Sequence, residues 1–513
     1  MKRTYVLTIL DGWGLGKLIE SNPIHAASPE TIKFLESSFP AAALQASGVA
    51  IGLPFEEEGN SEVGHLTLGA GKIIYQHYPR IMMKIEDGSF FKNKFLKEAF
   101  ARAREKNSAV HLAGLLTSGN VHASFRHLAA LIEMAKRESC QNLFIHVFAD
   151  GKDSPPRSFM ELLGKLKAEV QKNGVGTIAS VAGRYYAMDR DGHWDRTEAA
   201  YKALTGDLPI SAPEEAVKSA YTRELDDEFI EPTAFEAHAI KDGDALIFFN
   251  FREDSMRQIA ESFLNPKLDK FPIKIFSNLY IVTMTAYEDK WRARVAFPSE
   301  RVGNPLGKVL ADKGLNQLRI AETEKYAHVT YFFNGGREKP YPNEFRVLVP
   351  SKTAVREEEH PEMMASAVTD RAIVALNEGG FDFILVNYAN PDIIAHTGNY
   401  DAAVQAIKTV DKELNRLVDA VLKGNHVMIV TSDHGNAEEV LNPRTGEPET
   451  KHNANPVPIY LVGKDFQKPK PEEILHHPET IGLLADVAPT ILELMNIPKP
   501  PEMTGQSLLN QLI

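Results

Sequence analysis

The sequence predicts an α/β protein of two domains, in which helices cover the faces of a sheet. Three observations carry this prediction: the chain has 513 residues, short β-rich apolar runs alternate with longer amphipathic segments, and polar residues gather directly after the apolar runs. A single hydrophobic core stops growing at about 250–300 residues, so two domains are expected. Alternating strand and helix patterns are typical of α/β proteins.

Nine apolar runs are predicted to be strands. Several are almost continuously apolar, as expected for strands that are covered on both faces. Segment Asp401–Lys423 has apolar residues at helical spacing, and Gly424 can end that helix directly before a strand that starts at Val427. The nine predicted strands are Tyr5–Leu10, Val110–Leu116, Leu143–Phe148, Thr177–Val181, Ala245–Asn250, Tyr280–Met284, Phe383–Val386, Val427–Val430 and Val457–Val462.

Two segments resemble crossings between domains. One is Gln76–Arg80, and the other is Phe297–Pro305, which contains proline and glycine. We therefore expect residues 1–76 and 301–513 to form one discontinuous domain, and residues 77–300 to form a second domain inserted into it.

The charge balance excludes some classes of partner. The 57 Lys and Arg residues against 69 Asp and Glu residues give a net charge of −12, which repels nucleic acid and anionic membranes. No apolar run approaches membrane-spanning length, and Tyr5–Leu10 is too short for the core of a signal peptide. The single cysteine, Cys140, fits a reducing compartment. We expect a cytoplasmic enzyme with a local basic pocket for any anionic substrate.

Carboxylates and imidazoles follow the predicted strands in a pattern that suits divalent metals. Asp392 and His396 stand four residues apart, so one helical turn brings both to one side, and Asp433 and His434 are adjacent after a strand. Each residue alone has a simpler interpretation as a turn former, a helix cap or a hydrogen-bonded side chain. Together they favour two metals, and mixed Asp and His ligands suit Mn²⁺ or Zn²⁺ better than Ca²⁺. The candidate ligands are Asp11, Asp392, His396, Asp433, His434 and His452.

Ser61 is the candidate nucleophile. It stands in the segment GNSEVGH at 59–65, which is compatible with the start of a helix, where free N–H groups and the helix dipole favour phosphate. The simpler interpretation of Ser61 is a helix cap. A metal bound to Oγ would make the hydroxyl a nucleophile at neutral pH, so the nucleophile hypothesis depends on the metal ligands.

Seven motifs spread over nearly the whole chain resemble the cofactor-independent (2,3-bisphosphoglycerate-independent) phosphoglycerate mutases, a family of the alkaline phosphatase superfamily. The longest of them are too specific to be expected in a generic phosphatase. The motifs are LDGWG at 10–14, GNSEVGH at 59–65, GRYYAMDRD at 183–191, AETEKYAHVTYFFNGG at 321–336, NYANPDIIAHTG at 387–398, SDHGNAEE at 432–439 and NPVP at 455–458.

The resemblance implies a fold, a reaction and a set of cofactors. The fold is an alkaline-phosphatase-like discontinuous domain with an inserted α/β transferase domain. The reaction interconverts 3-phosphoglycerate and 2-phosphoglycerate through phosphoserine, in glycolysis and gluconeogenesis, with two Mn²⁺ and without bisphosphoglycerate. One ion takes Asp392, His396 and His452, and the other takes Asp11, Ser61, Asp433 and His434.

The same resemblance implies the residues that contact the substrate. Guanidinium groups suit a phosphorylated carboxylate because they bind anions through two hydrogen bonds. Asp153 is the candidate acid and base, and Lys325 is expected to stabilise the transferring phosphoryl group. The implied contacts are His122, Asp153, Arg184, Arg190, Arg252 and Lys325.

Three positions depart from the family pattern on the substrate side. The usual FRPDRARQ is FREDSMRQ at 251–258, so Ser255 stands in place of an arginine, and the usual DGRD and GGVHSH are DGKD at 150–153 and GNVHAS at 119–124. In an extended segment Arg257 would share a side with Ser255, whereas on a helix it would turn away. We expect Arg257 to supply the missing charge, with Lys152 as the second choice and a pocket with one arginine fewer as the simpler alternative.

Two other functions stay open from the sequence. A metal-dependent phosphomonoesterase or another phosphomutase of the superfamily would share the metal ligands and Ser61 but not the basic residues of the inserted domain. A binding protein that has lost catalysis would keep the fold, although the complete set of ligands argues against it. For the favoured function we expect a monomer that acts on a small-molecule substrate, phosphoglycerate.

Overall fold

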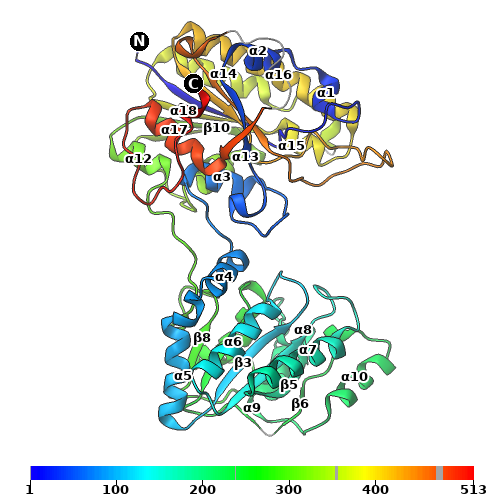
Figure 1. The fold of residues 1–513 in the computed structure, drawn as a ribbon. Helices are drawn as coiled ribbons and strands as arrows, with labels where there is room; N and C mark the ends of the chain where they lie inside the picture. The colour runs from blue at the N-terminus through cyan, green and yellow to red at the C-terminus, as the bar shows by residue number, and fades with distance from the viewer. Residues whose placement is uncertain (1, 237, 353–355, 469–477) are drawn as a thin grey trace. The chain divides into compact units, whose positions relative to one another are not determined.

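The computed structural model describes residues 2–236, 238–352, 356–468 and 478–513. The chain divides into two compact units, each built on its own sheet (Figure 1). Unit 1 comprises Met1–Tyr75 and Glu300–Ile513, and unit 2 comprises Gln76–Ser299. Unit 1 is therefore assembled from both ends of the chain.

Unit 1 contains an eight-stranded sheet in the order β11-β10-β12-β1-β13-β14-β2-β15. Neighbouring strands are parallel except at β14, which runs antiparallel to both β13 and β2. The strands are β1 (Tyr5–Leu10), β2 (Ala41–Gln45), β10 (Gln317–Glu322), β11 (Glu344–Val349), β12 (Phe383–Tyr388), β13 (Val427–Thr431), β14 (Val457–Val462) and β15 (Thr480–Leu483).

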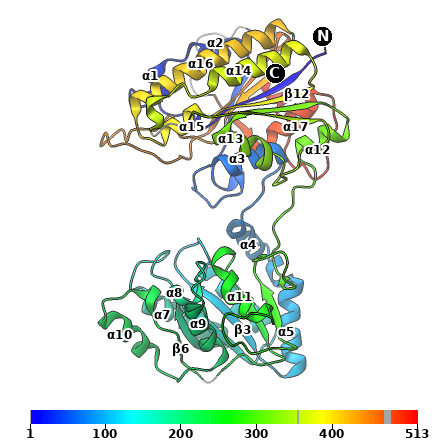
Figure 2. The ribbon, with the colours of Figure 1, turned by 180° about the vertical axis from the view of Figure 1, so that it is seen from behind.

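Helices cover both faces of this sheet (Figures 1 and 2). Strand β1 illustrates why, because Val6 and Leu10 belong to one apolar core while Leu7 and Ile9 belong to the other, as the two-residue period of a strand requires. Helices α2, α14 and α16 pack in the first core, and α3, α12 and α17 pack in the second. The helices of unit 1 are α1 (Pro23–Ala27), α2 (Glu30–Ser38), α3 (Ser61–Ala70), α12 (Leu306–Asp312), α13 (Thr323–Ala327), α14 (Ala365–Glu378), α15 (Asn390–Ala395), α16 (Tyr400–Lys423), α17 (Val487–Leu494) and α18 (Leu509–Leu512).

Unit 2 contains a seven-stranded sheet in the order β6-β5-β4-β3-β7-β8-β9. Its strands are parallel except for the short edge strand β6. The strands are β3 (Val110–Leu116), β4 (Leu143–Ala149), β5 (Thr177–Gly183), β6 (Thr233–Ala234), β7 (Ala245–Phe248), β8 (Tyr280–Thr283) and β9 (Arg294–Val295).

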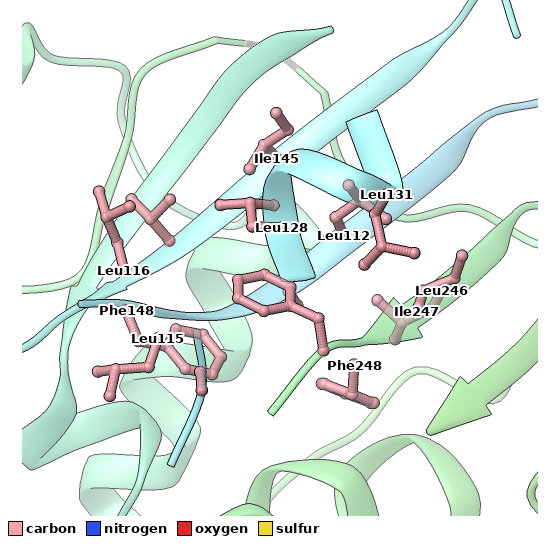
Figure 3. Packing of buried hydrophobic residues seen from close by; sticks show 14 of the residues in the cluster. Leu112, Leu115, Leu116, Leu128, Leu131, Ile145, Phe148, Leu246, Ile247 and Phe248 are labelled. Atoms are coloured by element: carbon pink, nitrogen blue, oxygen red, sulfur yellow. The ribbon is translucent and has the colours of Figure 1, made fainter. Parts of the chain in front are cut away.

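The core of unit 2 joins the sheet to its helices. Figure 3 shows part of this core, with side chains from β3, β4 and β7 and from helix α6. The helices are α4 (His77–Glu86), α5 (Lys94–Lys106), α6 (Phe125–Arg137), α7 (Phe159–Asn173), α8 (Arg184–Ala187), α9 (Trp194–Thr205), α10 (Pro213–Thr222) and α11 (Arg257–Leu264).

The α/β class, the nine predicted strands and the predicted helix before Val427 are confirmed. Helix α16 ends at Lys423 and is capped by Gly424. Six strands in the described part of the chain were not predicted. Strands β6 and β9 have two residues each, β2 is rich in alanine, β10 contains the buried Arg319, and the edge strands β11 and β15 are partly exposed. No helix in the described part of the chain combines the length and apolar character that a membrane crossing requires.

Candidate metal centre and anion pocket

The candidate metal ligands of unit 1 gather at one edge of its sheet. Strands β10, β12, β1 and β13 are parallel neighbours, so the residues that follow them meet at the edge where their carboxyl ends lie. Lys325, Asp392, Asp11 and Asp433 come after these four strands in that order across the sheet. Strand β14 is antiparallel, so its start, shortly after His452, lies at the same edge.

Ser61 reaches this edge as the first residue of helix α3. The cap of the helix is Asn60, whose side chain accepts a hydrogen bond from the backbone N–H of Val63. The interpretation of Ser61 as the helix cap is therefore wrong, and its hydroxyl is available for other contacts. The helix lies close against the turn after β13, because a Cβ on Gly64 would lie 2.6 Å from the carbonyl oxygen of Asp433.

We call Asp11, Ser61, Asp433 and His434 the serine-side set. Its side chains are buried, and Ser61 Oγ lies 2.9 Å from His434 Nε2 and 3.1 Å from Asp11 Oδ1. His434 Nε2 also lies 3.7 Å from Asp11 Oδ1 and 3.6 Å from Asp433 Oδ2. Asp433 Oδ2 is buried, and His65 Nδ1 lies 3.1 Å from it. The three non-serine ligands form one of the groups whose atoms are close enough to share an ion.

We call Asp392, His396 and His452 the histidine-side set. Asp392 is in helix α15 and His396 caps the end of that helix, so one helical turn does bring them together, with 3.3 Å between Asp392 Oδ1 and His396 Nε2. His452 Nε2 lies 3.4 Å from the same Asp392 oxygen and 3.0 Å from His396 Nε2. Asp392 and His452 also form a second possible ion-binding group together with His434.

The donors and acceptors of the histidine-side set fit a cation. The Nδ1 atoms of His396 and His452 lie 2.9 Å and 2.8 Å from the carbonyl oxygens of Thr450 and Gly59. Carbonyl oxygens only accept hydrogen bonds, so each Nδ1 carries the proton and each Nε2 of a neutral ring presents a lone pair. Two lone pairs and a carboxylate oxygen thus converge on one point, which is the donor set of a transition metal.

The charges of the buried side chains also indicate a bound cation. The buried carboxylates of Asp11, Asp392 and Asp433 face the buried ammonium of Lys325, whose Nζ lies 2.6 Å from Asp11 Oδ1, 2.5 Å from Asp392 Oδ2 and 2.7 Å from Ser61 Oγ. Burial alone would lower the pKa of Lys325, but Asp11, Asp392 and Asp433 raise it above its ordinary value, so the ammonium stays charged. It offsets one of three negative charges, and buried charge without a partner is costly.

Lys325 and the histidines also act on the carboxylates. Burial raises the pKa of Asp392 and Asp433 by itself, but Lys325 holds the pKa of Asp392, and His434 that of Asp433, below the usual range. Asp11 differs, because its burial and the neighbouring Asp433 raise its pKa. A cation beside Asp11 would therefore stabilise its charged form.

Three polar residues around the ligands were not identified from the sequence. Asn387 Nδ2 donates to Asp11 Oδ2 (2.7 Å), and Asn436 Nδ2 donates to Asp392 Oδ1 (2.7 Å). Glu438 is buried and accepts from the backbone N–H groups of Gly14 and Asn436. All three lie inside the motifs NYANPDIIAHTG and SDHGNAEE, so their closeness in sequence to the predicted ligands could have identified them.

Unit 2 holds the other predicted contacts around a cavity of ≈ 260 Å³. His122, Arg184 and Arg252 follow β3, β5 and β7, which run parallel in one sheet with β4 between β3 and β5, so they also meet at a carboxyl-end edge. Asp254 bridges two of the arginines, with 2.5 Å to Arg190 Nη1 and 3.2 Å to Arg252 Nε. The cavity is lined by His122, Lys152, Arg184, Arg190, Arg196 and Arg252 together with polar and acidic neighbours. This concentration of positive charge suits an anion.

Asp153 lies beside this pocket and is paired with His122 and Arg184. His122 Nδ1 donates to Asp153 Oδ2 (2.7 Å), and Arg184 Nη1 lies 3.1 Å from Asp153 Oδ1. Burial alone would raise the pKa of Asp153, but the hydrogen bond from His122 and the charge of Arg184 lower it. The carboxylate is therefore ionised near neutral pH and is able to accept a proton.

The structure contradicts the expectation that Arg257 replaces the arginine missing at Ser255. Arg257 begins helix α11, and its Nε donates to the carbonyl oxygen of Tyr287 (3.0 Å). Lys152, the second choice, lines the cavity and pairs with Glu228 (2.8 Å). Ser255 lines the cavity as well, and its buried Oγ has no hydrogen-bond partner among the described residues.

Two family models match the chain. The model described as the N-terminus of BPG-independent PGAM matches residues 81–289, and the sulfatase model matches residues 257–497. The first falls on unit 2 and the second largely on unit 1. Together with the two sheets and their helices, these matches confirm the predicted fold class, an alkaline-phosphatase-like domain with an inserted α/β domain.

Relatives that match this chain over nearly its whole length are named 2,3-bisphosphoglycerate-independent phosphoglycerate mutases. The 2,3-bisphosphoglycerate-independent phosphoglycerate mutase of Moorella thermoacetica is 44% identical, with 99% of both chains covered. That of Thermomicrobium roseum is 46% identical and covers 98% of this chain and 97% of its own. A crystal structure of Leishmania mexicana phosphoglycerate mutase at low cobalt concentration matches with a TM-score of 0.56 and 27% identity, over 99% of this chain and 97% of that one. The chain belongs to the family of 2,3-bisphosphoglycerate-independent phosphoglycerate mutases.

Proposed function

We propose that this protein is an isomerase that interconverts 3-phosphoglycerate and 2-phosphoglycerate through phosphoserine at Ser61, with two divalent metal ions and without bisphosphoglycerate. The observation that carries the proposal is the convergence of lone pairs and carboxylates around one buried serine hydroxyl. Full-length relatives with the mutase name support the substrate assignment.

The residues present fit two ions. The serine-side set would hold one ion and the histidine-side set the other, and mixed carboxylate and imidazole ligands favour Mn²⁺ among the common hard cations. Bound ions would supply charge that makes the Ser61 hydroxyl nucleophilic and offsets the charge of the phosphoryl oxygens. On the serine side, the buried carboxylates of Asp11 and Asp433 leave negative charge that a cation would offset.

The side chains of unit 1 would carry out the transfer. Ser61 Oγ takes the phosphoryl group from O3 of 3-phosphoglycerate, and the P–O3 bond breaks. Lys325, whose Nζ lies 2.7 Å from Ser61 Oγ, offsets the developing charge on the transferring group. The C2 hydroxyl of the same glycerate then takes the phosphoryl group from Ser61, which restores the free serine without water or a second phosphate donor.

The side chains of unit 2 would bind the glycerate and move its proton. Arg184, Arg190 and Arg252 bind the carboxylate and phosphate through paired hydrogen bonds. Asp153 is held ionised by His122 and Arg184. In each of the two transfers it accepts the proton of the hydroxyl that attacks phosphorus and gives a proton to the oxygen that leaves phosphorus.

Phosphorus NMR of the purified protein tests the proposal. The protein is incubated with 3-phosphoglycerate and Mn²⁺ in the absence of bisphosphoglycerate, and the proposal predicts a new 2-phosphoglycerate signal. Release of inorganic phosphate alone would identify a phosphomonoesterase instead. An unchanged spectrum with the ions bound would identify a binding protein without catalysis.

We further propose that the protein acts as a monomer in the cytoplasm, in glycolysis and gluconeogenesis. The single cysteine and the net charge of −12 support a reducing, aqueous compartment. Light scattering coupled to size-exclusion chromatography tests the oligomeric state, and a mass of about twice the 57.0 kDa of the chain would contradict it.

A further inference from the structure

His65 is a fully buried histidine next to the proposed metal centre, and nothing in the proposed reaction uses it. It lies one helical turn after Ser61 in α3. Its Nδ1 lies 2.8 Å from the carbonyl oxygen of Ser61 and 3.1 Å from Asp433 Oδ2. Both of these atoms only accept hydrogen bonds, so Nδ1 carries a proton.

The other ring nitrogen of His65 leads to a further ligand. Nε2 lies 3.0 Å from Asn387 Nδ2, which also donates to Asp11 Oδ2 at 2.7 Å. An amide nitrogen has two hydrogens, so Asn387 can donate one to Asp11 and the other to His65. With its proton on Nδ1, the ring donates to the carbonyl oxygen of Ser61, has the same nitrogen 3.1 Å from Asp433 Oδ2, and accepts from Asn387 at Nε2.

We propose that His65 is a positioning residue for the ion bound by the serine-side set. One ring touches the backbone of Ser61 and the Asp433 carboxylate directly, and it reaches Asp11 through Asn387. Ligating carboxylates are held by outer hydrogen bonds whose loss weakens metal binding. The inference rests on the proposed two-metal function and adds a residue to it.

Burial and packing explain why such a residue stands at this place. The close approach of α3 to Asp433, which Gly64 permits, leaves the helix side chain one turn after Ser61 in contact with that carboxylate. The His65 ring also packs against the ring of His328, with 5.4 Å between centroids. A ring fixed in this way determines where the Asp433 carboxylate can lie.

Calorimetric titration of metal-free protein with Mn²⁺ tests the proposal. Wild type is expected to show two binding events, and His396→Ala identifies the event that belongs to the histidine-side set. His65→Ala is expected to weaken the other event about 10–100-fold and to leave the histidine-side event unchanged. His65→Asn, which keeps a donor near the position of Nδ1, is expected to recover part of the lost affinity.

Thr67→Val is the matched control, because Thr67 is in the same helix and is buried, and its Oγ1 has no hydrogen-bond partner among the described residues. It should bind both ions as wild type does. The proposal is overturned if His65→Ala binds both ions with unchanged affinity, or if both events weaken equally in His65→Ala and His65→Asn.

The readout separates this inference from the proposed reaction. Wild type that binds two ions but does not isomerise phosphoglycerate contradicts the reaction, and site-selective weakening in His65→Ala still supports the role of His65. Normal turnover in wild type together with unchanged ion binding in His65→Ala contradicts the role of His65 alone.

Discussion

Both units contain a cluster of histidines with acidic partners, but the two clusters arrange their donors and acceptors in opposite ways. In unit 2, His111 Nε2 lies 3.2 Å from Asp244 Oδ2, His111 Nδ1 lies 2.9 Å from His146 Nε2, and His146 Nδ1 lies 2.7 Å from Ser180 Oγ. Because the carboxylate only accepts, the hydrogen bonds run in one direction from Ser180 through both rings to Asp244. Every donor meets an acceptor, and the cluster is complete.

In unit 1, atoms that can only accept hydrogen bonds point toward one another. The Nε2 lone pairs of His396 and His452 and an oxygen of Asp392 converge, and their Nδ1 protons are engaged elsewhere. The comparison shows that a histidine next to a buried carboxylate is not by itself a sign of a metal site. The direction of the hydrogen bonds separates a structural relay from a site that requires a cation.

The largest effect is expected at Ser61. Ser61→Ala removes the group that carries the phosphoryl group between the two hydroxyls, so kcat should fall by about 10⁴-fold or more while the fold survives. Phosphorus NMR with 3-phosphoglycerate measures the turnover, and Thr67→Val in the same helix is the control. Activity of Ser61→Ala within about tenfold of wild type would exclude a covalent intermediate.

The pocket of unit 2 gives the next effect. Arg252→Ala and Lys152→Ala each remove positive charge from the cavity lining, so kcat/KM should fall by the equivalent of about 2–4 kcal/mol. Arg257→Ala is the matched control, since its guanidinium bonds the backbone of Tyr287. Steady-state kinetics with 3-phosphoglycerate measures all three. An unchanged kcat/KM in Lys152→Ala would mean that the pocket works with one charge fewer at Ser255.

The hydrogen-bonded chain Ser180–His146–His111–Asp244 of unit 2, which we call the relay, should stabilise the fold without any ion. Ser180→Ala leaves the buried Nδ1 of His146 without its donor, which should lower the free energy of unfolding by about 1–3 kcal/mol. Thr283→Val is the control, because its buried Oγ1 has no hydrogen-bond partner in the described structure. Urea unfolding measures both. A loss of stability in Ser180→Ala that added Mn²⁺ reverses would mean that the relay is also an ion site.

Acid should destabilise unit 2 through its neutral histidines. Burial lowers the pKa of His127 to about 3, so below the ordinary histidine value of 6.5 the unfolded chain takes up a proton that the folded chain refuses. The free energy of unfolding should therefore fall by up to about 1.4 kcal/mol per pH unit between pH 6.5 and 3. His127→Leu should lose this part of the slope, and urea unfolding at several pH values tests it, with the exposed His360→Gln as control. Parallel slopes for His127→Leu and wild type would contradict the assignment.

The sequence could predict the elements whose signal is local. Continuous apolar runs located the central strands, and the residues after them supplied the candidate ligands. The spacing of Asp392 and His396 predicted their approach, because one helical turn fixes it. The alanine-rich β2 and the two-residue strands carry too weak a pattern to be found in this way.

Contacts that depend on register could not be predicted. His111 and His146 meet only because β3 pairs with β4 so that Ala113 stands beside His146. His452 reaches the metal edge because β14 is antiparallel, and the choice between a capping and a free Ser61 depended on Asn60. Arg257 shows the same limit, since the start of helix α11 decides which way it points.

Manganese stoichiometry tests the central distinction between the two histidine clusters most directly. Metal-free wild type, His396→Ala and His111→Gln are dialysed against Mn²⁺, and the bound metal is measured per chain. The convergent acceptors of unit 1 predict two ions in wild type, one tightly bound ion in His396→Ala and two in His111→Gln. Wild type that retains no manganese, or loss of an ion in His111→Gln, would contradict the account.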